Sequence, residues 1–180
     1  MSLIENLKNS NDLRDFFCQE CSENNVSVNI DKTVNLNDIL IIKVDDYYNQ
    51  NILNPPPSPD CLIIQRCNPD NFNIYIVELK NINSPQGFAI ENIVAKFNTC
   101  LDNFMSEIFG NYFNGEHINY NQIKLLFVTD PYDFKLHPDK QLKMRGHKLD
   151  FLISTRIPKY FNHHLYIEHK LPDPMIKLCS

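Results

Sequence analysis

The chain has 180 residues, of which 43% are hydrophobic and 22% are charged. This composition indicates one soluble globular domain, residues 1–180, and excludes disordered and fibrous proteins. No apolar run approaches the roughly 20 residues of a membrane-spanning helix, and the first residues carry no secretion signal. We therefore expect a cytoplasmic protein without a membrane partner, or a nuclear one if the source is eukaryotic.

Charge is distributed unevenly along the chain. Residues 1–134 hold 8 Lys and Arg against 18 Asp and Glu, a net charge of −10, whereas residues 135–180 hold 9 against 4, a net charge of +5. Such segregation is typical of an acidic, metal-collecting pocket beside a phosphate-binding surface. Uneven scatter in a small protein is the alternative explanation.

The first half of the chain predicts a helix and then a hairpin. Residues 11–23 carry apolar side chains at helical spacing, whereas residues 36–48 fit a strand or a helix equally well. Four prolines between Pro55 and Pro59 enforce an extended, stiff approach to the next segment. Residues 60–66 and 73–80 then read as strands joined by a short turn, which predicts an antiparallel hairpin.

A long amphipathic helix is predicted over residues 88–108. Its apolar positions form one stripe: Ile90, Ile93, Val94, Phe97, Leu101, Phe104, Met105 and Ile108. Residues 123–129 predict a buried strand, and further strands are expected near 149–154 and 164–169. This order of elements predicts an α/β fold.

Acidic side chains stand at one end of the predicted hairpin. Asp60 begins the first strand directly after Pro59, and Glu78 and Lys80 end the second strand. Residues two apart on a strand project from the same face, so Glu78 and Lys80 should lie together while Leu79 points the other way. Two carboxylates and a backbone carbonyl suit Mg²⁺, a hard cation, and the lysine can orient the attacking water.

The arrangement Pro59-Asp60, then Glu78-Leu79-Lys80, then an amphipathic helix resembles the PD-(D/E)xK nuclease superfamily over about residues 58–108. The resemblance implies a restriction-endonuclease-like core, in which helices flank a central mixed sheet. It also implies that Asp60, Glu78 and the Leu79 carbonyl bind Mg²⁺, for which Mn²⁺ can substitute, and that Lys80 assists the attack. The alternative is that Glu78 and Lys80 belong to the solvated face of an ordinary strand.

Members of this superfamily often add an acidic residue from an N-terminal helix. Glu20 is the candidate for that metal ligand, with Glu23 as the nearby alternative. Glu91 could also face the site, although a glutamate near a helix start is explained equally well by the helix dipole. Lys96 could contact phosphate, although a solvated lysine is the simpler interpretation.

The densest basic stretch is His137–Lys148. Its Lys140, Lys143, Arg145 and Lys148 could neutralise backbone phosphates, and Arg145 could read a guanine edge. A solubilising loop is the alternative interpretation.

The six cysteines are expected to be reduced thiols in an intracellular chain. Cys18 and Cys21 form a CxxC pair that could supply half of a zinc site, but the remaining cysteines provide no second pair. Core or surface thiols are therefore the preferred interpretation.

The expected function is Mg²⁺-dependent hydrolysis of DNA by an enzyme that resembles the type II restriction endonucleases. That resemblance implies a homodimer in which each subunit cuts one strand. An RNA endonuclease similar to those of segmented negative-strand viral polymerases is the second possibility, although no histidine precedes His117 here. The third is a module with a nuclease fold that binds nucleic acid without cutting it.

Overall fold

The structure is a computed structural model, which describes residues 2–82, 84, 87–137 and 147–179. The helices are α1 (Leu3–Lys8), α2 (Val44–Asn51), α3 (Ile90–Asn98), α4 (Gly110–Phe113) and α5 (Lys148–Ile153), with the 3₁₀ turns η1 (Arg14–Phe16) and η2 (Leu36–Asp38) and the π-helix η4 (Thr99–Ile108). The strands are β1 (Phe17–Cys18), β2 (Cys21–Glu23), β3 (Val26–Ile30), β4 (Ile39–Lys43), β5 (Cys61–Asn68), β6 (Asn71–Lys80), β7 (Asn119–Thr129), β8 (Arg156–Tyr160), β9 (His163–Lys170) and β10 (Met175–Ile176).

Two sheets of unequal size organise the fold. The large mixed sheet has the strand order β1-β4-β5-β6-β7-β9-β8, and the small sheet has the order β10-β3-β2. Within the large sheet, β7 runs parallel to both β6 and β9, and all the other neighbouring strands of this sheet are antiparallel. The connection from β6 to β7 passes through α3, η4 and α4, as a crossover between parallel strands requires.

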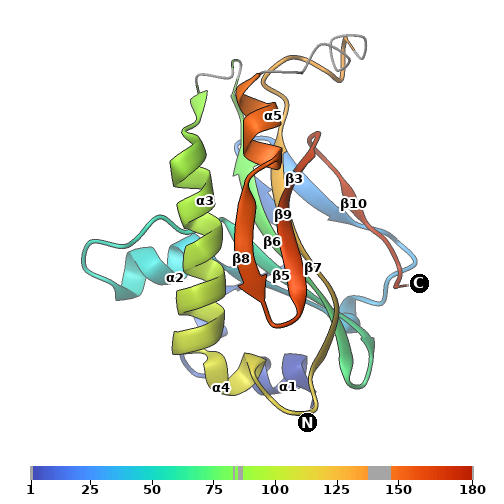
Figure 1. Cartoon of the computed structure of the whole chain (residues 1–180). Coiled ribbons are helices and arrows are strands. Elements are labelled where there is room, and N and C mark those ends of the chain that lie inside the picture. Colours follow the sequence, from blue (N-terminus) through green and yellow to red (C-terminus); the bar gives the residue numbers. More distant parts are fainter. Residues whose placement is uncertain (1, 83, 85–86, 138–146, 180) are drawn as a thin grey trace.

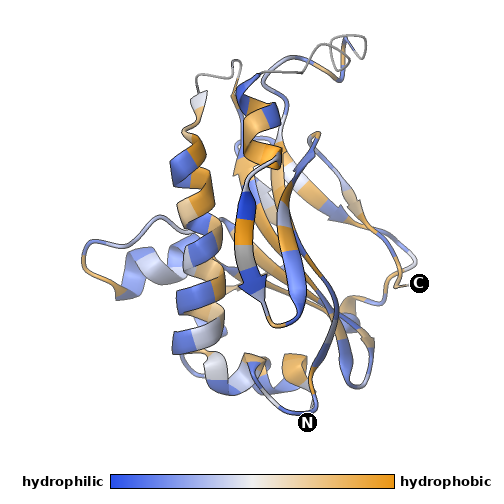
Figure 2. Cartoon of the chain, viewed as in Figure 1, coloured by the Kyte–Doolittle hydropathy of each residue, from blue (hydrophilic) through white to orange (hydrophobic). Residues whose placement is uncertain are grey.

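The large sheet is covered on both faces (Figure 1). The continuous helix formed by α3 and η4 crosses one face, and the small sheet packs on the other. Alternation along β6 divides its side chains between two cores: Ile74 and Ile76 face the helices, whereas Tyr75 and Val77 face the small sheet. Figure 2 shows the resulting pattern, with hydrophobic strands between the layers and a hydrophobic stripe along the helix.

Several predicted elements are confirmed. Strands β5 and β6 form the expected antiparallel hairpin, in which Cys61 pairs with Val77. The helix expected over 88–108 runs from Ile90 to Ile108, with π geometry in its second half, and at its end the Phe109 N–H donates to the Phe104 carbonyl at 3.0 Å. The strand expected at 123–129 is the carboxyl-terminal part of β7, and the strand expected at 164–169 is the central part of β9. The fold is α/β, with a large mixed sheet flanked by helices.

The helix predicted over residues 11–23 is wrong. This segment contains only the turn η1 and then the short strands β1 and β2. Leu13 and Phe16 belong to the core beneath the helices, whereas Cys21 belongs to the core between the sheets. A single helix face could not reach both cores, so the chain extends and crosses from one to the other.

Two further segments also differ from the expectations. Residues 36–48 contain both of the predicted structures in succession, because strand β4 is followed directly by helix α2. The strand predicted near 149–154 is the helix α5, whose buried residues Leu149 and Leu152 are three apart, as one face of a helix requires.

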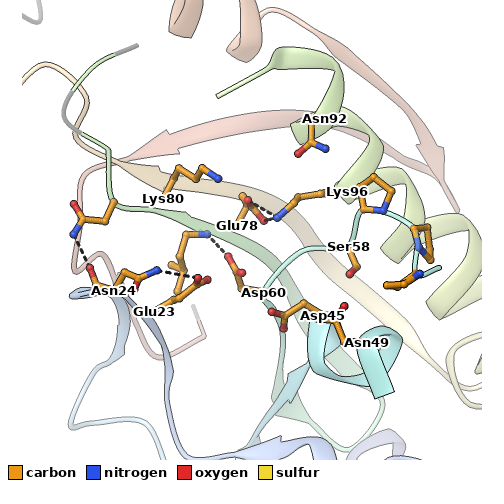
Figure 3. Close-up of a pocket in the computed structure, with 15 residues that line it drawn as sticks. Glu23, Asn24, Asp45, Asn49, Ser58, Asp60, Glu78, Lys80, Asn92 and Lys96 are labelled. Atoms are coloured by element: carbon orange, nitrogen blue, oxygen red, sulfur yellow. Dashed lines mark hydrogen bonds and ion pairs between the residues drawn. The ribbon is translucent and has the colours of Figure 1, made fainter. Parts of the chain in front are cut away.

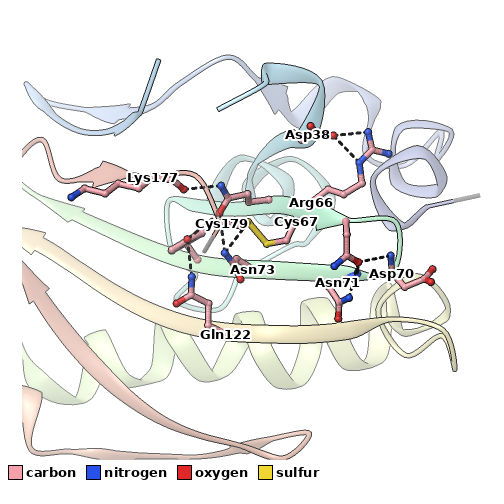
Figure 4. Close-up of a disulfide and its surroundings, with 12 residues drawn as sticks. Asp38, Arg66, Cys67, Asp70, Asn71, Asn73, Gln122, Lys177 and Cys179 are labelled. Atoms are coloured by element: carbon pink, nitrogen blue, oxygen red, sulfur yellow. Dashed lines mark hydrogen bonds and ion pairs between the residues drawn. A yellow bond between two sulfur atoms is a disulfide. The ribbon is translucent and has the colours of Figure 1, made fainter. Parts of the chain in front are cut away.

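Four of the six cysteines are not free thiols, which corrects the expectation from the sequence. Cys21 is bonded to Cys61 and Cys67 to Cys179, with Cα–Cα distances of 6.0 and 5.5 Å. Cys18, the other half of the CxxC pair, is a half-buried free thiol close to the Ile41 carbonyl. Both disulfides attach segments of the small-sheet layer to β5, one near each end of that strand; Figure 4 shows the second.

No helix among the described residues is both long and apolar enough to cross a membrane.

Candidate active site

The carboxyl end of β6 supplies the first half of the site. Glu78 and Lys80 leave the same side of the strand, and Leu79 packs into the core between the two sheets, as predicted. Glu78 is only 1% exposed although it carries a carboxyl group. A buried carboxylate is costly unless it is paired or bound to a cation, so the position of Glu78 requires a charged partner.

Asp60 lies directly beside this strand end. The proline run brings the chain to Asp60, and β5 begins at the next residue, paired antiparallel with β6. The Leu79 N–H donates to Asp60 Oδ2 at 2.5 Å, which fixes the orientation of the carboxyl group. Asp60 is 4% exposed.

Asp60, Glu78 and Lys80 line one polar cavity of about 500 Å³. The hairpin, the small sheet, α2, the proline run and α3 all contribute to its wall (Figure 3). The lining residues are Glu23, Asn24, Asp45, Asn49, Pro55, Pro56, Pro57, Ser58, Asp60, Glu78, Leu79, Lys80, Asn81, Asn92 and Lys96. The cavity thus collects four carboxyl groups and two ammonium groups.

Lys96 is the partner of Glu78. Its ammonium group lies 2.7 Å from Glu78 Oε1 and 2.9 Å from Oε2, and its side chain is 19% exposed. The expected solvated lysine is therefore wrong. Burial lowers the pKa of Lys96, but the ion pair with Glu78 and the charges of Asp60 and Asp45 together outweigh burial and raise that pKa. Burial raises the pKa of Glu78 in turn, against the opposing effect of Lys96.

Asp45 reaches the cavity from the start of α2. Strand β4 pairs Lys43 with Cys61, and the Val44 N–H donates to the Asp60 carbonyl at 3.2 Å, so α2 begins beside Asp60. Asp45 Oδ1 is buried and has no hydrogen-bond partner among the described residues, and burial raises the pKa of this carboxyl group. An unpartnered buried carboxylate oxygen in a cavity that other carboxyl groups also line is a suitable ligand for a hard cation.

Glu23 forms the other side of the acidic cluster. It ends β2, two residues after the cysteine that is bonded to Cys61, and accepts a hydrogen bond from Asn24 Nδ2 at 3.0 Å. Figure 3 shows the Asp60 carboxyl group between those of Glu23 and Asp45 in this view. Burial, then the charge of Glu78 and the contact with Glu23, raise the pKa of Asp60 to about 9. The site without a cation therefore holds a proton on Asp60 at neutral pH.

The other acidic candidates do not join this cluster. Glu20 is exposed in the link between β1 and β2 and does not line the cavity, so its predicted inward orientation is wrong. Glu91 is also exposed and outside the cavity wall, to which the next residue, Asn92, contributes instead. Of Glu20, Glu23 and Glu91, Glu23 is the residue that lines the cavity with Asp60.

The predicted phosphate-binding residues are described only in part. Lys140, Lys143 and Arg145 lie outside the described residues. The Lys148 ammonium donates to the Phe88 carbonyl and lies 5.0 Å from the centre of the Phe88 ring. Lys148 therefore anchors α5 to the segment before α3 rather than standing free for phosphate.

Most of the side-chain oxygen atoms that line this cavity belong to carboxyl groups, which are the ligands that Mg²⁺ and Mn²⁺ prefer. In the described ranges, no three His, Cys, Asp or Glu side chains are grouped closely enough to hold a metal ion as they stand. Both oxygens of Glu78 are instead occupied by the Lys96 ammonium group.

Comparisons with protein-family models, with curated proteins and with solved structures found no match to this chain.

Proposed function

We propose that the chain is a divalent-metal-dependent endonuclease that hydrolyses DNA phosphodiester bonds and resembles the PD-(D/E)xK nucleases, most closely the type II restriction endonucleases. The observation that carries the proposal is the convergence of Asp60, Glu78 and Lys80 on one cavity at the end of a buried hairpin. The strand, turn, strand and long helix that surround these residues have the order that the resemblance requires.

The free-energy cost of burying Asp60 and Glu78 together also supports a catalytic role. Asp60 and Glu78 are both buried, and each raises the free energy of the other in its ionised form. Clusters of carboxyl groups with strongly perturbed pKa values are typical of functional sites, because a stable fold does not otherwise need them. A purely structural role leaves the burial of Asp60 and Glu78 in one cavity without an explanation.

Each residue has a chemical task in this proposal. Asp60, Glu78 and the Leu79 carbonyl hold Mg²⁺ or Mn²⁺, and Asp45 and Glu23 supply further oxygens. When bound, the cation supplies Lewis acidity for the phosphate and for the attacking water. Lys80 orients that water and offsets the negative charge that develops on the phosphate. A homodimer, with one site for each strand, remains the prediction that goes with a restriction enzyme.

Cleavage of supercoiled plasmid tests this function, with single-stranded RNA tested in parallel. We expect discrete DNA fragments with Mg²⁺ or Mn²⁺, no cleavage with EDTA, and a decrease of at least about a hundredfold in Lys80→Ala. Lys8→Ala, a lysine outside the cavity, is the matched control and should cut like wild type.

Other outcomes would redirect the assignment. Degraded RNA beside intact plasmid would indicate the RNA endonuclease instead. Metal-dependent binding without cleavage of either substrate would indicate a non-cleaving nucleic-acid-binding module.

The role of Asp45 can be tested separately from catalysis. We expect Asp45→Asn to weaken Mn²⁺ binding about tenfold, because the cation loses an anionic oxygen. Asp46→Asn, the exposed neighbour on the same helix turn, should leave the affinity nearly unchanged. Titration calorimetry with both variants makes the comparison, and equal affinities in the two variants would exclude Asp45 from the site.

The cellular compartment in which the chain acts is also a proposal. The sequence favours the cytoplasm or nucleus, whereas two disulfides favour an oxidising environment. Counting free thiols in protein isolated from its native source would decide between these settings.

A further inference from the structure

The bond between Lys96 and Glu78 has an unusual setting for a buried ion pair. One ammonium group contacts both oxygens of the carboxylate, at 2.7 and 2.9 Å, in the wall of the candidate active site. Glu78 is 1% exposed, and its oxygens face the ammonium rather than the other carboxyl groups of the cavity. The residue that should bind the cation is therefore already engaged by a cation of the protein itself.

The charges around Lys96 match those of a metal site. Four carboxyl groups and two ammonium groups line the cavity, so two negative charges are left once Asp60 has released its proton to admit a cation. That difference equals the charge of one divalent cation. Besides Glu78, the negative charges of Asp60 and Asp45 also act on Lys96, which places its ammonium among the same carboxylates that a metal ion would need.

Lys96 is able to leave this position. Its ammonium group is carried by a flexible four-carbon stem, and its side chain is partly exposed to the cavity. Glu78, in contrast, is held within β6, which is hydrogen-bonded to a neighbouring strand on each side. If the two separate, the lysine moves and the carboxylate stays.

We propose that Lys96 competes with the divalent cation for Glu78, so that the Glu78–Lys96 ion pair and the metal-bound site exclude one another. This inference rests on the proposed metal site and adds its regulation. In the cation-free protein, Lys96 satisfies the buried carboxylate and keeps the fold intact. When a divalent cation takes its place at Glu78, the ammonium group turns into the cavity, where it can contact a phosphate of the substrate. Metal binding therefore precedes productive substrate binding.

Mn²⁺ affinity is the direct test, measured from the electron paramagnetic resonance signal of free Mn²⁺. Lys96→Met removes the competing charge and retains most of the stem. We expect it to bind Mn²⁺ at least about tenfold more tightly than wild type, as follows if the ion pair occupies over nine-tenths of the cation-free molecules. Lys80→Met is the matched control, because it removes a positive charge from the same cavity wall without breaking the ion pair, and it should change the affinity less than about threefold.

Lys96→Met could fail to fold without metal, because it leaves Glu78 buried and unpaired. Lys96→Arg then serves as the second variant. Its guanidinium group can hold the carboxylate with two parallel hydrogen bonds, so we expect a folded protein that binds Mn²⁺ several-fold more weakly than wild type.

The outcomes separate this inference from the function on which it rests. Wild-type protein that binds Mn²⁺ with the same affinity as Lys96→Met, or as Lys96→Arg where Lys96→Met does not fold, would overturn the competition and leave the metal site standing. Wild-type and Lys96→Met proteins that both fail to bind Mn²⁺ would overturn the proposed site itself, and the competition with it.

Discussion

Asp60→Asn is expected to lower metal-dependent cleavage by about a thousandfold and, at the same time, to stabilise the cation-free protein by about 1–3 kcal/mol. Cleavage falls because an amide is a poor ligand for a hard cation. Stability rises because the variant no longer buries an acid whose ionised form is repelled by Glu78. The amide oxygen can still accept the hydrogen bond from the Leu79 N–H, so the local backbone should not change.

The stabilising effect of Asp60→Asn should depend on pH. The pKa of Asp60 is raised from 3.8 to about 9 in the folded protein. Between these values the unfolded chain releases the proton and the folded, cation-free chain retains it, so wild-type stability falls as pH rises. The variant lacks this loss. Urea unfolding in EDTA at pH 5 and pH 8 should show a larger difference at pH 8.

Asp46→Asn, at an exposed position, is the control for this pH dependence. An advantage of Asp60→Asn that is equal at both pH values would show that Asp60 does not retain its proton. Saturating Mn²⁺ should abolish the advantage, since the cation stabilises only the wild-type site.

Removal of the disulfide between Cys21 and Cys61 is expected to have the second large effect. The bond joins residues 40 apart in sequence, and the chain-entropy model assigns about 4 kcal/mol to a loop of that length. Replacing both cysteines by alanine should therefore reduce the free energy of unfolding by about 2–4 kcal/mol. It should also weaken Mn²⁺ binding about tenfold, because Glu23 follows Cys21 by two residues on a three-residue strand.

The second disulfide provides the matched control for this experiment. Cys67 and Cys179 also attach a segment of the small-sheet layer to β5, but near its other end, and neither residue lines the candidate active site. Their replacement by alanine should lower stability by a similar amount and leave Mn²⁺ affinity unchanged. Equal losses of affinity in the two double variants would mean that the first disulfide has no particular link to Glu23.

Short-range patterns explain what could be predicted from the sequence. Glu78 and Lys80 are two apart on one strand, and Asp60 begins the strand beside it, so alternation and the hairpin turn alone bring them together. The same holds for the long helix, whose stripe from Ile90 to Ile108 is periodic throughout. Each of these features follows from strand alternation, a short turn or helix periodicity, which the sequence displays directly.

Contacts between distant segments explain what could not be predicted. Asp45 enters the cavity because β4 pairs with β5, and no local pattern indicates that pairing. Lys96 lies 18 residues after its partner Glu78. Helix periodicity places Lys96 on one face of α3, but it does not identify Glu78 of β6 as the residue that this face contacts. A helix over residues 11–23 favours Glu20 over Glu23, whereas the observed strands β1 and β2 leave Glu20 outside the cavity and place Glu23 in its wall.

The small sheet also has a consequence for synthesis of the chain. Strand β10 lies parallel to β3, with Met175 opposite Asn29, and the hydrogen bond from the Asn29 N–H to the Pro174 carbonyl crosses the same seam. During translation β3 leaves the ribosome long before this partner exists, so its outer edge stays unpaired until residues 175 and 176 have been made. Because β2 pairs with β3, Glu23 should be the last carboxyl group to take its position in the cavity. The proposed metal site would therefore be incomplete until strand β10 has been made.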